Sequence, residues 1–289
     1  MNLVVGSTGL LGGEICRLLA EAGQPLRALV RTTSDPGRVD RLRSLGAEIV
    51  EGDLADPASL ERACAGVSAV LSTATAISTG GSLQETDERG QMNLIEAARG
   101  TKVGHFIFVS FLEVPVQVPL QDAKRAVERK LQGSLPYTIL RSANFMEFWL
   151  SPMVGWEIAN GRVTILGPGD RSVNWISLHD VARMAVASLT DPRARDTVLE
   201  FGGDYASPNQ VVALVEEATG ERLQVTHVPV EELQAAKEAA ADPASETLAG
   251  LRLAIALGYP EDHTATLREF VPDPVTVRAF ALEQATHGS

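Results

Sequence analysis

The chain has 289 residues, of which 45% are hydrophobic and 21% are charged, a composition typical of globular proteins. Its formal net charge of -12 argues against nucleic acid or an anionic membrane as the main partner, because both repel an acidic surface. No apolar run reaches the roughly 18 residues of a transmembrane helix, and the amino-terminal residues lack the pattern of a signal peptide, so we expect a cytoplasmic protein without a membrane span.

The first 142 residues alternate between strand-like and helix-like segments. Strands rich in Val, Ile, Leu and Phe are predicted at 2–5, 26–30, 47–53, 68–74, 105–110 and 137–142, and helices between them, for example at 10–23 and 85–100. Such alternation produces parallel strands joined by crossover helices, with ligands at the carboxyl ends of the strands. The sequence therefore predicts the α/β class, with a doubly wound parallel-sheet Rossmann fold in residues 1–142.

The pattern changes after residue 142. A strand with a turn is predicted at 161–170, a helix at 177–192, a strand at 197–203, and helices at 207–220, 230–241 and 244–258. We expect residues 143–289 to form a smaller, mostly helical substrate-binding lobe, with a segment of about 176–203 returning to the core.

A glycine-rich turn follows the first strand and precedes the first helix. Gly6, Gly9 and Gly12 have G-x-x-G-x-x-G spacing in "VVGSTGLLGGEI". Glycine permits the tight turn and the close approach of a pyrophosphate, which the positive end of the following helix attracts. We therefore predict a dinucleotide site, with a turn that binds no ligand as the alternative. The other candidate contacts in this turn are Thr8, Leu10 and Leu11.

The end of the second strand bears on the choice of cofactor. NAD-binding folds usually place Asp or Glu about 20 residues after the glycines, where it binds the ribose 2′-hydroxyl. This chain has Arg31 there, and a guanidinium suits the 2′-phosphate of NADP(H). We predict a preference for NADP(H) over NAD(H), with a merely solvated Arg31 as the alternative.

Further candidate cofactor contacts follow other strands, because these strand ends meet at one edge of the sheet. They are Asp53, Leu54, Thr73, Ala74, Thr75, Ser110, Phe111 and Asn144, and Lys124 at the start of a helix is a further candidate. Asp53 could equally be a turn residue.

No group of His, Cys and Glu has the spacing of a metal site, so no metal ligand is predicted. Cys16 and Cys64 lie among apolar helical residues, which predicts buried thiols in a reducing compartment rather than a disulfide. Asp180 is predicted to be a helix N-cap, and His179 beside it a structural residue.

Several motifs together resemble the atypical short-chain dehydrogenases/reductases of the NmrA-like group. They are "GSTGLLG", "ALVR", "EGDLAD", Lys124 at the start of its helix, "LPYTILRSANFMEFW", "VNWISLHDVARMAVASL", "VPVEELQAAKEAA" and "TATLREFVPDPVTVRAF". The resemblance extends over nearly the whole chain. It implies one of several activities: NADPH-dependent reduction of quinones or dyes, reduction of the isoflavone-reductase type, nucleotide sensing without catalysis, or assembly of photosystems.

The resemblance also exposes a departure from the usual catalytic pair. Ordinary short-chain reductases have a proton-donating tyrosine four residues before the lysine, and this chain has Leu120 there. Tyr137, Tyr205 and Tyr259 do not have the required spacing. The usual mechanism therefore does not transfer directly to this chain.

Lys124 shares a helical stripe with Val127 and Leu131, which predicts that it faces inward. A buried lysine needs a partner. Three roles stay open: anchoring the nicotinamide ribose, donating a proton, or a structural lysine at a helix start. Ser110 stands where the resemblance implies the catalytic serine, although a hydroxyl that caps a strand end is equally consistent with the sequence.

Two functions remain in competition. The first is an NADPH-dependent oxidoreductase that transfers hydride to an apolar, quinone-like or carbonyl acceptor. The second is a non-catalytic sensor of NADP(H) or an assembly factor with a protein partner, which the loss of the tyrosine favours. The candidate substrate-pocket residues are Phe111, Phe145, Met146, Phe148, Trp149 and Trp175.

Overall fold

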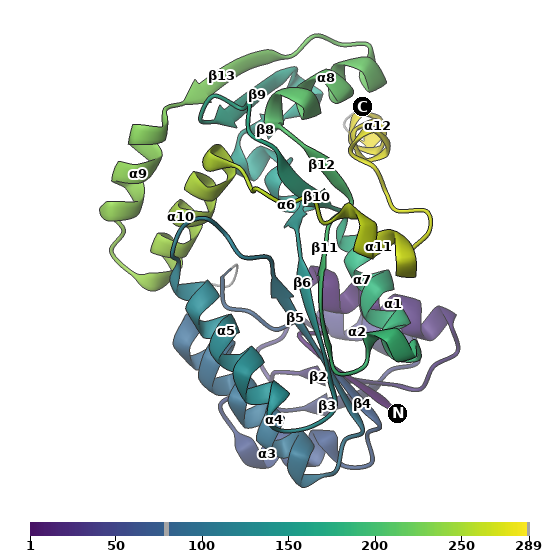
Figure 1. The fold of residues 1–289 in the computed structure, drawn as a ribbon. Coiled ribbons are helices and arrows are strands. Elements are labelled where there is room, and N and C mark those ends of the chain that lie inside the picture. Colours follow the sequence, from purple (N-terminus) through teal and green to yellow (C-terminus); the bar gives the residue numbers. More distant parts are fainter. Residues whose placement is uncertain (78–80, 288–289) are drawn as a thin grey trace. The chain divides into compact units, whose positions relative to one another are not determined.

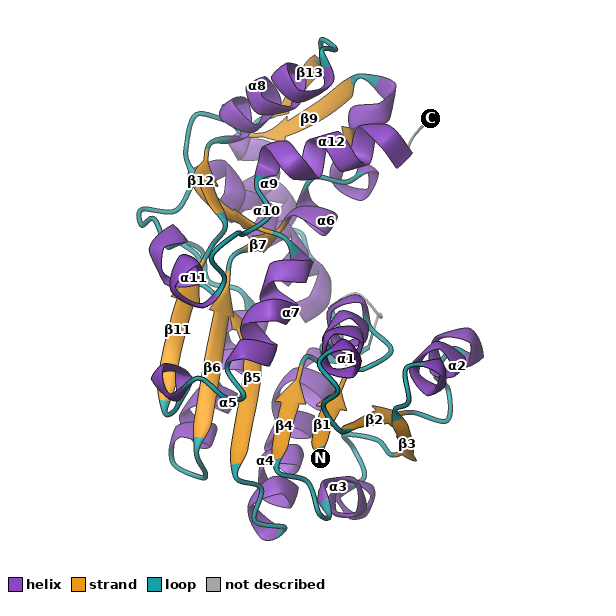
Figure 2. Cartoon of the chain, turned by 90° about the vertical axis from the view of Figure 1, so that its right-hand side faces the viewer, coloured by secondary structure: helices purple, strands orange, loops and turns teal. Residues whose placement is uncertain are grey.

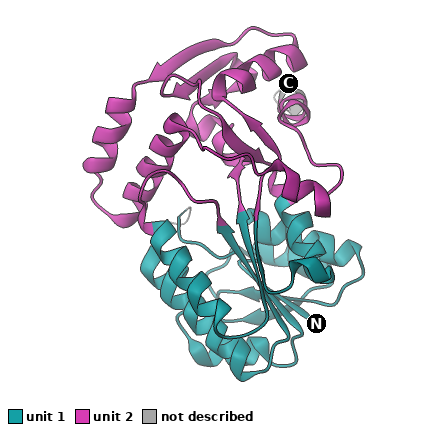
Figure 3. Ribbon diagram, viewed as in Figure 1, with its two compact units in different colours: residues 1–110, 120–141, 181–199 teal, residues 111–119, 142–180, 200–289 magenta. Residues whose placement is uncertain are grey.

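The computed structural model describes residues 1–77 and 81–287. The chain forms two compact units, coloured separately in Figure 3. Unit 1 comprises residues 1–110, 120–141 and 181–199, and unit 2 comprises residues 111–119, 142–180 and 200–289. These units are defined by packing alone, and the domain limits expected from the sequence stay a prediction.

Unit 1 is built on a seven-stranded sheet with the order β11-β6-β5-β4-β1-β2-β3. Its strands are β1 (Asn2–Val5), β2 (Leu26–Val30), β3 (Glu48–Glu51), β4 (Ala69–Ser72), β5 (His105–Phe111), β6 (Tyr137–Ser142) and β11 (Thr197–Phe201). The pairs β1·β2, β1·β4, β2·β3 and β4·β5 are all parallel. The Rossmann-type fold predicted from the sequence is confirmed.

Helices cover both faces of this sheet. They are α1 (Leu10–Glu21), α2 (Pro36–Ser44), α3 (Pro57–Cys64), α4 (Gln91–Gly100), α5 (Pro119–Gln132) and α7 (Leu178–Ala187), with a π-helical turn η1 (Gln84–Gly90) and a short 3-10 turn η4 (Pro192–Ala194). Figures 1 and 2 show α1 and α2 on one face and α3, α4 and α5 on the other. Asp35 and Asp56 cap α2 and α3 with their side chains, and each is followed by a proline, which explains where these helices begin.

The strand order reverses between β1 and β4. In a doubly wound sheet, the loops that follow the two strands at such a reversal form the ligand crevice. Here these loops are the glycine turn after β1 and the segment from Thr73 after β4. They touch: a Cβ added to Gly6 would lie 2.6 Å from Thr73 Oγ1 and 2.8 Å from the backbone nitrogen of Ala74.

The core of unit 1 confirms the inward stripe of α5. Val127 and Leu131 are fully buried in a cluster that includes Phe106 and Phe108 of β5. Cys16 and Cys64 are buried thiols, as predicted, and burial raises their pKa values to about 12 and about 11.

Unit 2 combines helices with two small sheets, ordered β12-β10-β7 and β13-β9-β8. Its strands are β7 (Asn144–Phe145), β8 (Trp156–Glu157), β9 (Arg162–Leu166), β10 (Val173–Ile176), β12 (Asp204–Ala206) and β13 (Gln224–Val228). Its helices are α6 (Met146–Trp149), α8 (Pro208–Thr219), α9 (Val230–Glu238), α10 (Pro243–Leu257), α11 (Thr264–Phe270) and α12 (Val277–His287), with 3-10 turns η2 (Pro152–Val154) and η3 (Ile158–Asn160).

Two details of unit 2 differ from the sequence-based prediction. The strand β13 pairs in parallel with β9 in a region expected to be mostly helical. The predicted N-cap at Asp180 was wrong: Asp180 lies inside α7, its N–H donates to the Ser177 hydroxyl at 3.0 Å, and its carboxylate accepts from the Val275 N–H at 2.6 Å. Ser177 therefore performs the capping, because it precedes the helix by one residue.

None of the helices in residues 1–77 and 81–287 is long and apolar enough to cross a membrane.

Candidate functional site

The glycine turn has one conformationally demanding position and one tightly packed one. Gly6 adopts a positive φ of 85°, and its carbonyl accepts from the Gly9 N–H at 2.9 Å. A Cβ on Gly12 would lie 2.1 Å from the Gly6 oxygen, whereas a Cβ on Gly9 would meet only that oxygen, at 3.2 Å. Gly6 and Gly12 therefore maintain the turn, while Gly9 is the glycine that the fold itself requires least.

The start of α1 provides groups for an anion. Its N-cap is Gly9, which has no side chain to cap the first N–H groups, and the first intrahelical bond runs from the Gly13 N–H to the Gly9 oxygen. No acidic residue lies in the first turn, and the Leu10 side chain is 73% exposed. Uncapped N–H groups at the positive end of a helix favour a phosphate. This geometry fits the pyrophosphate of a dinucleotide.

Two arginines, Arg31 and Arg38, follow the carboxyl end of β2. Arg31 directly follows β2 and is exposed, with no side-chain hydrogen bond or ion pair to another described residue. Arg38, in the first turn of α2, is also exposed and donates to the Thr8 oxygen at 2.9 Å. The nearest downstream acid, Asp35, accepts from the Arg38 N–H as the N-cap of α2. Sequence reasoning missed Arg38, although its place in the first turn after a capping Asp35-Pro36 pair could have indicated it.

Most of the other candidate side chains of unit 1 form hydrogen bonds with backbone groups of the protein. Asp53 accepts from the Ala55 N–H at 2.8 Å, which makes it a turn residue. Leu54 is buried, and the space beside Gly90 is filled by its side chain. The hydroxyl and N–H of Thr73 both donate to the Val5 oxygen, at 3.2 and 2.9 Å. Thr75 is partly buried, and its hydroxyl accepts from the Ile77 N–H at 3.3 Å.

Lys124 is 5% exposed and has protein partners. Its ammonium nitrogen lies 3.4 Å from an oxygen of the fully buried Asp87 and 3.4 Å from the Val109 carbonyl oxygen. It also lies 4.8 Å from the centre of the Phe108 ring, within range of a cation–π interaction. The inward orientation predicted from the sequence is therefore present, with Asp87 as the nearest opposite charge.

Ser110 belongs to a second buried polar group. Its hydroxyl donates to Glu128 at 2.6 Å, and Glu128 also forms ion pairs with Arg125 and Arg141, both at 2.6 Å. Arg125 donates to the Ser110 oxygen at 3.1 Å. The Ser110 hydroxyl is thus part of a network that neutralises a buried carboxylate.

Leu120 and two of the tyrosines have contacts that do not suit them to replace the missing proton donor. Leu120 is buried at the start of α5. The Tyr259 hydroxyl donates to Asn144 Oδ1 at 3.1 Å, and burial raises the pKa of this phenol to about 12. The Tyr205 hydroxyl donates to the Tyr259 carbonyl at 2.7 Å. Both tyrosines, together with Asn144, therefore take part in structural contacts within unit 2.

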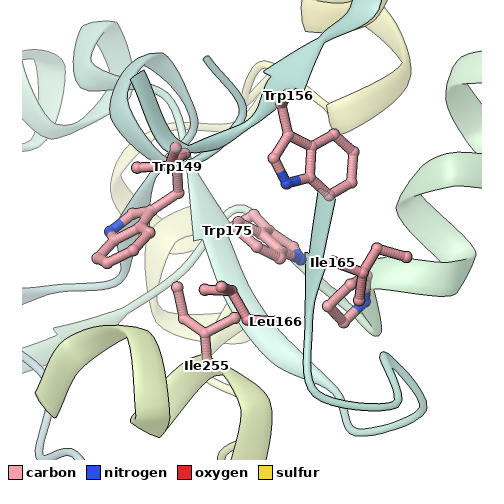
Figure 4. Close-up of a pocket in the computed structure, with 8 residues that line it drawn as sticks. Trp149, Trp156, Ile165, Leu166, Trp175 and Ile255 are labelled. Carbon is pink, nitrogen blue, oxygen red and sulfur yellow. The ribbon is translucent and has the colours of Figure 1, made fainter. Parts of the chain in front are cut away.

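Of the six candidate substrate-pocket residues, three are deeply buried. Trp175 is 1% exposed and donates its indole N–H to the Ala206 oxygen at 2.9 Å, and Met146 is also 1% exposed. Trp149 and Trp175 line a cavity with Trp156, Ile165 and other apolar side chains (Figure 4). The volume of this cavity is about 10 Å³, room for about one water molecule.

The other three candidates, Phe111, Phe145 and Phe148, keep part of their surface accessible. The Phe148 ring packs edge-on against Trp149 at a centroid distance of 4.9 Å. Within the part of the chain that the structure describes, no group of three metal-ligating side chains is found.

Comparison with known proteins places the chain in a family. The model of the NmrA-like family matches residues 2–256. The chain belongs to the NmrA-like family. A solved NADPH-dependent quinone oxidoreductase from Escherichia coli, complexed with NADPH, has the same fold, with a TM-score of 0.80, 23% identity and coverage of 99% of this chain and 100% of that one.

Two curated relatives of this chain have names that indicate different roles. The photosystem II assembly factor Ycf39 of Synechocystis is 32% identical, over 79% of this chain and 70% of that protein. An NAD(P)H azoreductase of Xenophilus azovorans is 28% identical, over 94% of this chain and 92% of that protein.

Proposed function

We propose that this NmrA-like protein is an NADPH-dependent oxidoreductase that reduces an apolar, quinone-like or carbonyl acceptor. The observation that supports it most is the glycine turn with an uncapped helix start, near the exposed Arg31 and Arg38, where the nearest downstream acid, Asp35, caps α2. The names of an azoreductase and of a quinone oxidoreductase among the similar proteins agree with this proposal.

In this proposal, the pyrophosphate lies against the N–H groups of Leu10, Leu11 and Gly12. Arg31 and Arg38 bind the 2′-phosphate, because guanidinium groups form charge-assisted hydrogen bonds with phosphate oxygens. The bound nicotinamide would supply a hydride to the acceptor. Lys124 contributes to positioning of the cofactor rather than proton donation, since Asp87 already compensates its charge inside the protein.

The residues at two usual catalytic positions favour particular acceptors. Leu120 cannot donate a proton, and the Ser110 hydroxyl already donates to Glu128. A carbonyl needs a proton as the hydride arrives, whereas water can protonate a reduced quinone. Quinone-like acceptors are therefore our first choice, and the partly exposed Phe111, Phe145 and Phe148 are the side chains that we propose to contact them.

The loss of NADPH absorbance in the presence of a panel of quinones, azo dyes and aldehydes tests this function. We expect steady turnover with at least one quinone or dye, and slower or no turnover with aldehydes. A Gly9→Val control should abolish turnover. Tight NADPH binding without turnover on any acceptor would refute the enzyme proposal.

A non-catalytic role is the second candidate. Leu120 at the tyrosine position and the engaged Ser110 favour it, and the relative Ycf39 is named as an assembly factor. In this case the NADP(H) site would regulate binding to a protein partner. The same absorbance assay separates the two candidates. The cytoplasmic location expected from the sequence stays a prediction.

A further inference from the structure

The π-helical turn η1 places a carboxylate inside unit 1. Asp87 lies in the middle of Gln84–Gly90, and its side chain is 0% exposed. Burying a carboxylate is costly unless it is paired and hydrogen-bonded, and π-helical turns occur frequently at functional sites. The contacts of Asp87 therefore need a functional or structural reason.

Each oxygen of Asp87 faces a different part of the candidate site. Oδ2 accepts from the Ala76 N–H at 2.8 Å, in the segment that follows β4. Oδ1 lies 3.4 Å from the Lys124 nitrogen and accepts no hydrogen bond in the described part of the chain. One carboxylate thus links the β4 segment to the lysine of α5.

Gln91, four residues after Asp87 at the start of α4, contacts the same segment. Its side-chain oxygen accepts from the Ser72 hydroxyl at 2.7 Å, and its side-chain nitrogen donates to the Ala74 oxygen at 3.1 Å. Ala74 in turn closely approaches Gly6 of the glycine turn. A continuous set of contacts therefore runs from the glycine turn, through residues 72–76, to Asp87 and Lys124.

We propose that Asp87 is a positioning residue of the dinucleotide site, which fixes Lys124 relative to the segment after β4. This inference rests on the proposed function, because it assigns Asp87 a role in holding the same cofactor. Asp87 does not touch the cofactor; it acts through Lys124, which it keeps in one place by charge attraction, and through the backbone at Ala76.

The variant Asp87→Asn tests the proposal, because asparagine has a similar shape and can still accept from Ala76 but lacks the charge. NADPH binding is measured by titration of NADPH fluorescence in four proteins: the parent, Asp87→Asn, Lys124→Met and the double variant. We expect Asp87→Asn to weaken binding about tenfold in the parent and by less than about twofold in the Lys124→Met background, since the two groups act as one unit. The emission of bound NADPH at saturation should also change in Asp87→Asn.

Asp180→Asn is the matched control. Asp180 is also fully buried and also accepts from a backbone N–H, that of Val275. This variant should leave NADPH affinity and emission unchanged. An equal loss of affinity from Asp87→Asn in both backgrounds, or no loss in the parent, would overturn the positioning role.

Because the readout is binding, it separates two failures. If the parent protein binds NADPH but shows no turnover, the enzyme proposal is refuted, and the role of Asp87 in binding can still be measured. A parent that binds no NADPH overturns both.

Discussion

The two ends of the candidate cofactor site in unit 1 are built in opposite ways. At the glycine turn, the helix start is uncapped, Leu10 is 73% exposed, and the Arg31 side chain is exposed. At the Lys124 end, Lys124, Asp87, Ser110 and Glu128 are all buried; Lys124 forms an ion pair with Asp87, and Ser110 donates to Glu128. Polar groups left open at a strand end are available to a ligand, whereas buried and paired groups mainly maintain geometry.

This contrast shows which sequence motifs support cofactor binding and which bear on catalysis. The glycine-turn end keeps its groups accessible, which agrees with a bound dinucleotide. The Lys124 end has the lysine and the serine expected of a reductase but Leu120 in place of the tyrosine, and its charges are compensated internally. We therefore infer that the binding of NADP(H) is the more firmly supported half of the proposal, and that the chemistry depends on an acceptor that needs little proton donation.

The largest expected effect is at the buried end. Lys124→Ala should lower the free energy of unfolding by about 3–5 kcal/mol, because it leaves the Asp87 carboxylate buried without its counter-charge. Thermal or urea unfolding measures this. The double variant Lys124→Ala/Asp87→Ala should recover part of the loss. A Lys124→Ala protein as stable as the parent would show that the pair is not a structural element.

The glycine turn gives the next effect. Gly9→Val should weaken NADPH binding at least about 100-fold while the chain stays folded, because the side chain would fill the space beside the pyrophosphate. Gly12→Val is the contrasting variant: its Cβ would lie 2.1 Å from the Gly6 oxygen, so this protein should not fold normally. Circular dichroism and NADPH titration distinguish the two. Retained binding in a folded Gly9→Val protein would show that the site lies elsewhere.

Much of this arrangement could be predicted from the sequence, because local patterns specify it. The alternation of strands and helices, the glycine spacing and the position of Arg31 are all local. The helical spacing of Lys124 with Val127 and Leu131, which predicts that Lys124 faces inward, is local as well. The partners of the buried charges could not be predicted, because they are distant in sequence. Asp87 of η1 pairs with Lys124 of α5, and Glu128 of α5 accepts from Ser110 of β5.

Other misses have equally specific causes. The strand β13 was missed because its partner β9 is distant in sequence: the paired residues Thr164 and Thr226 are 62 residues apart. Asp180 precedes an apolar helical run as a cap would, but Ser177 caps the helix, and the Asp180 carboxylate accepts from the distant Val275 N–H instead.

A smaller effect is expected at Arg31. Arg31→Ala should weaken NADPH binding about tenfold and change NADH binding little, because only NADPH has a 2′-phosphate for a charge-assisted hydrogen bond. Arg38→Ala should act in the same direction, to a smaller extent since this side chain already donates to the Thr8 oxygen. Equal losses for both nucleotides would indicate a general charge effect instead.

A last prediction concerns the two buried thiols, which lie outside the candidate cofactor contacts. Burial raises the pKa of Cys16 to about 12 and that of Cys64 to about 11, so both stay protonated at neutral pH. At a pH of about 8, the folded protein should react with a thiol reagent at least about 100-fold more slowly than the protein in urea, because only the thiolate reacts. A rapid reaction of the folded protein would show that one of these helices opens readily.

Calorimetric titration of the unmodified protein with NADPH and with NADH tests most directly whether the open end of the site is selective for NADP(H). The exposed arginines predict that NADPH binds at least several-fold more tightly than NADH, about 1 kcal/mol or more in binding free energy. Equal affinities for the two nucleotides would contradict this assignment of Arg31 and Arg38, and with it the proposed preference for NADP(H).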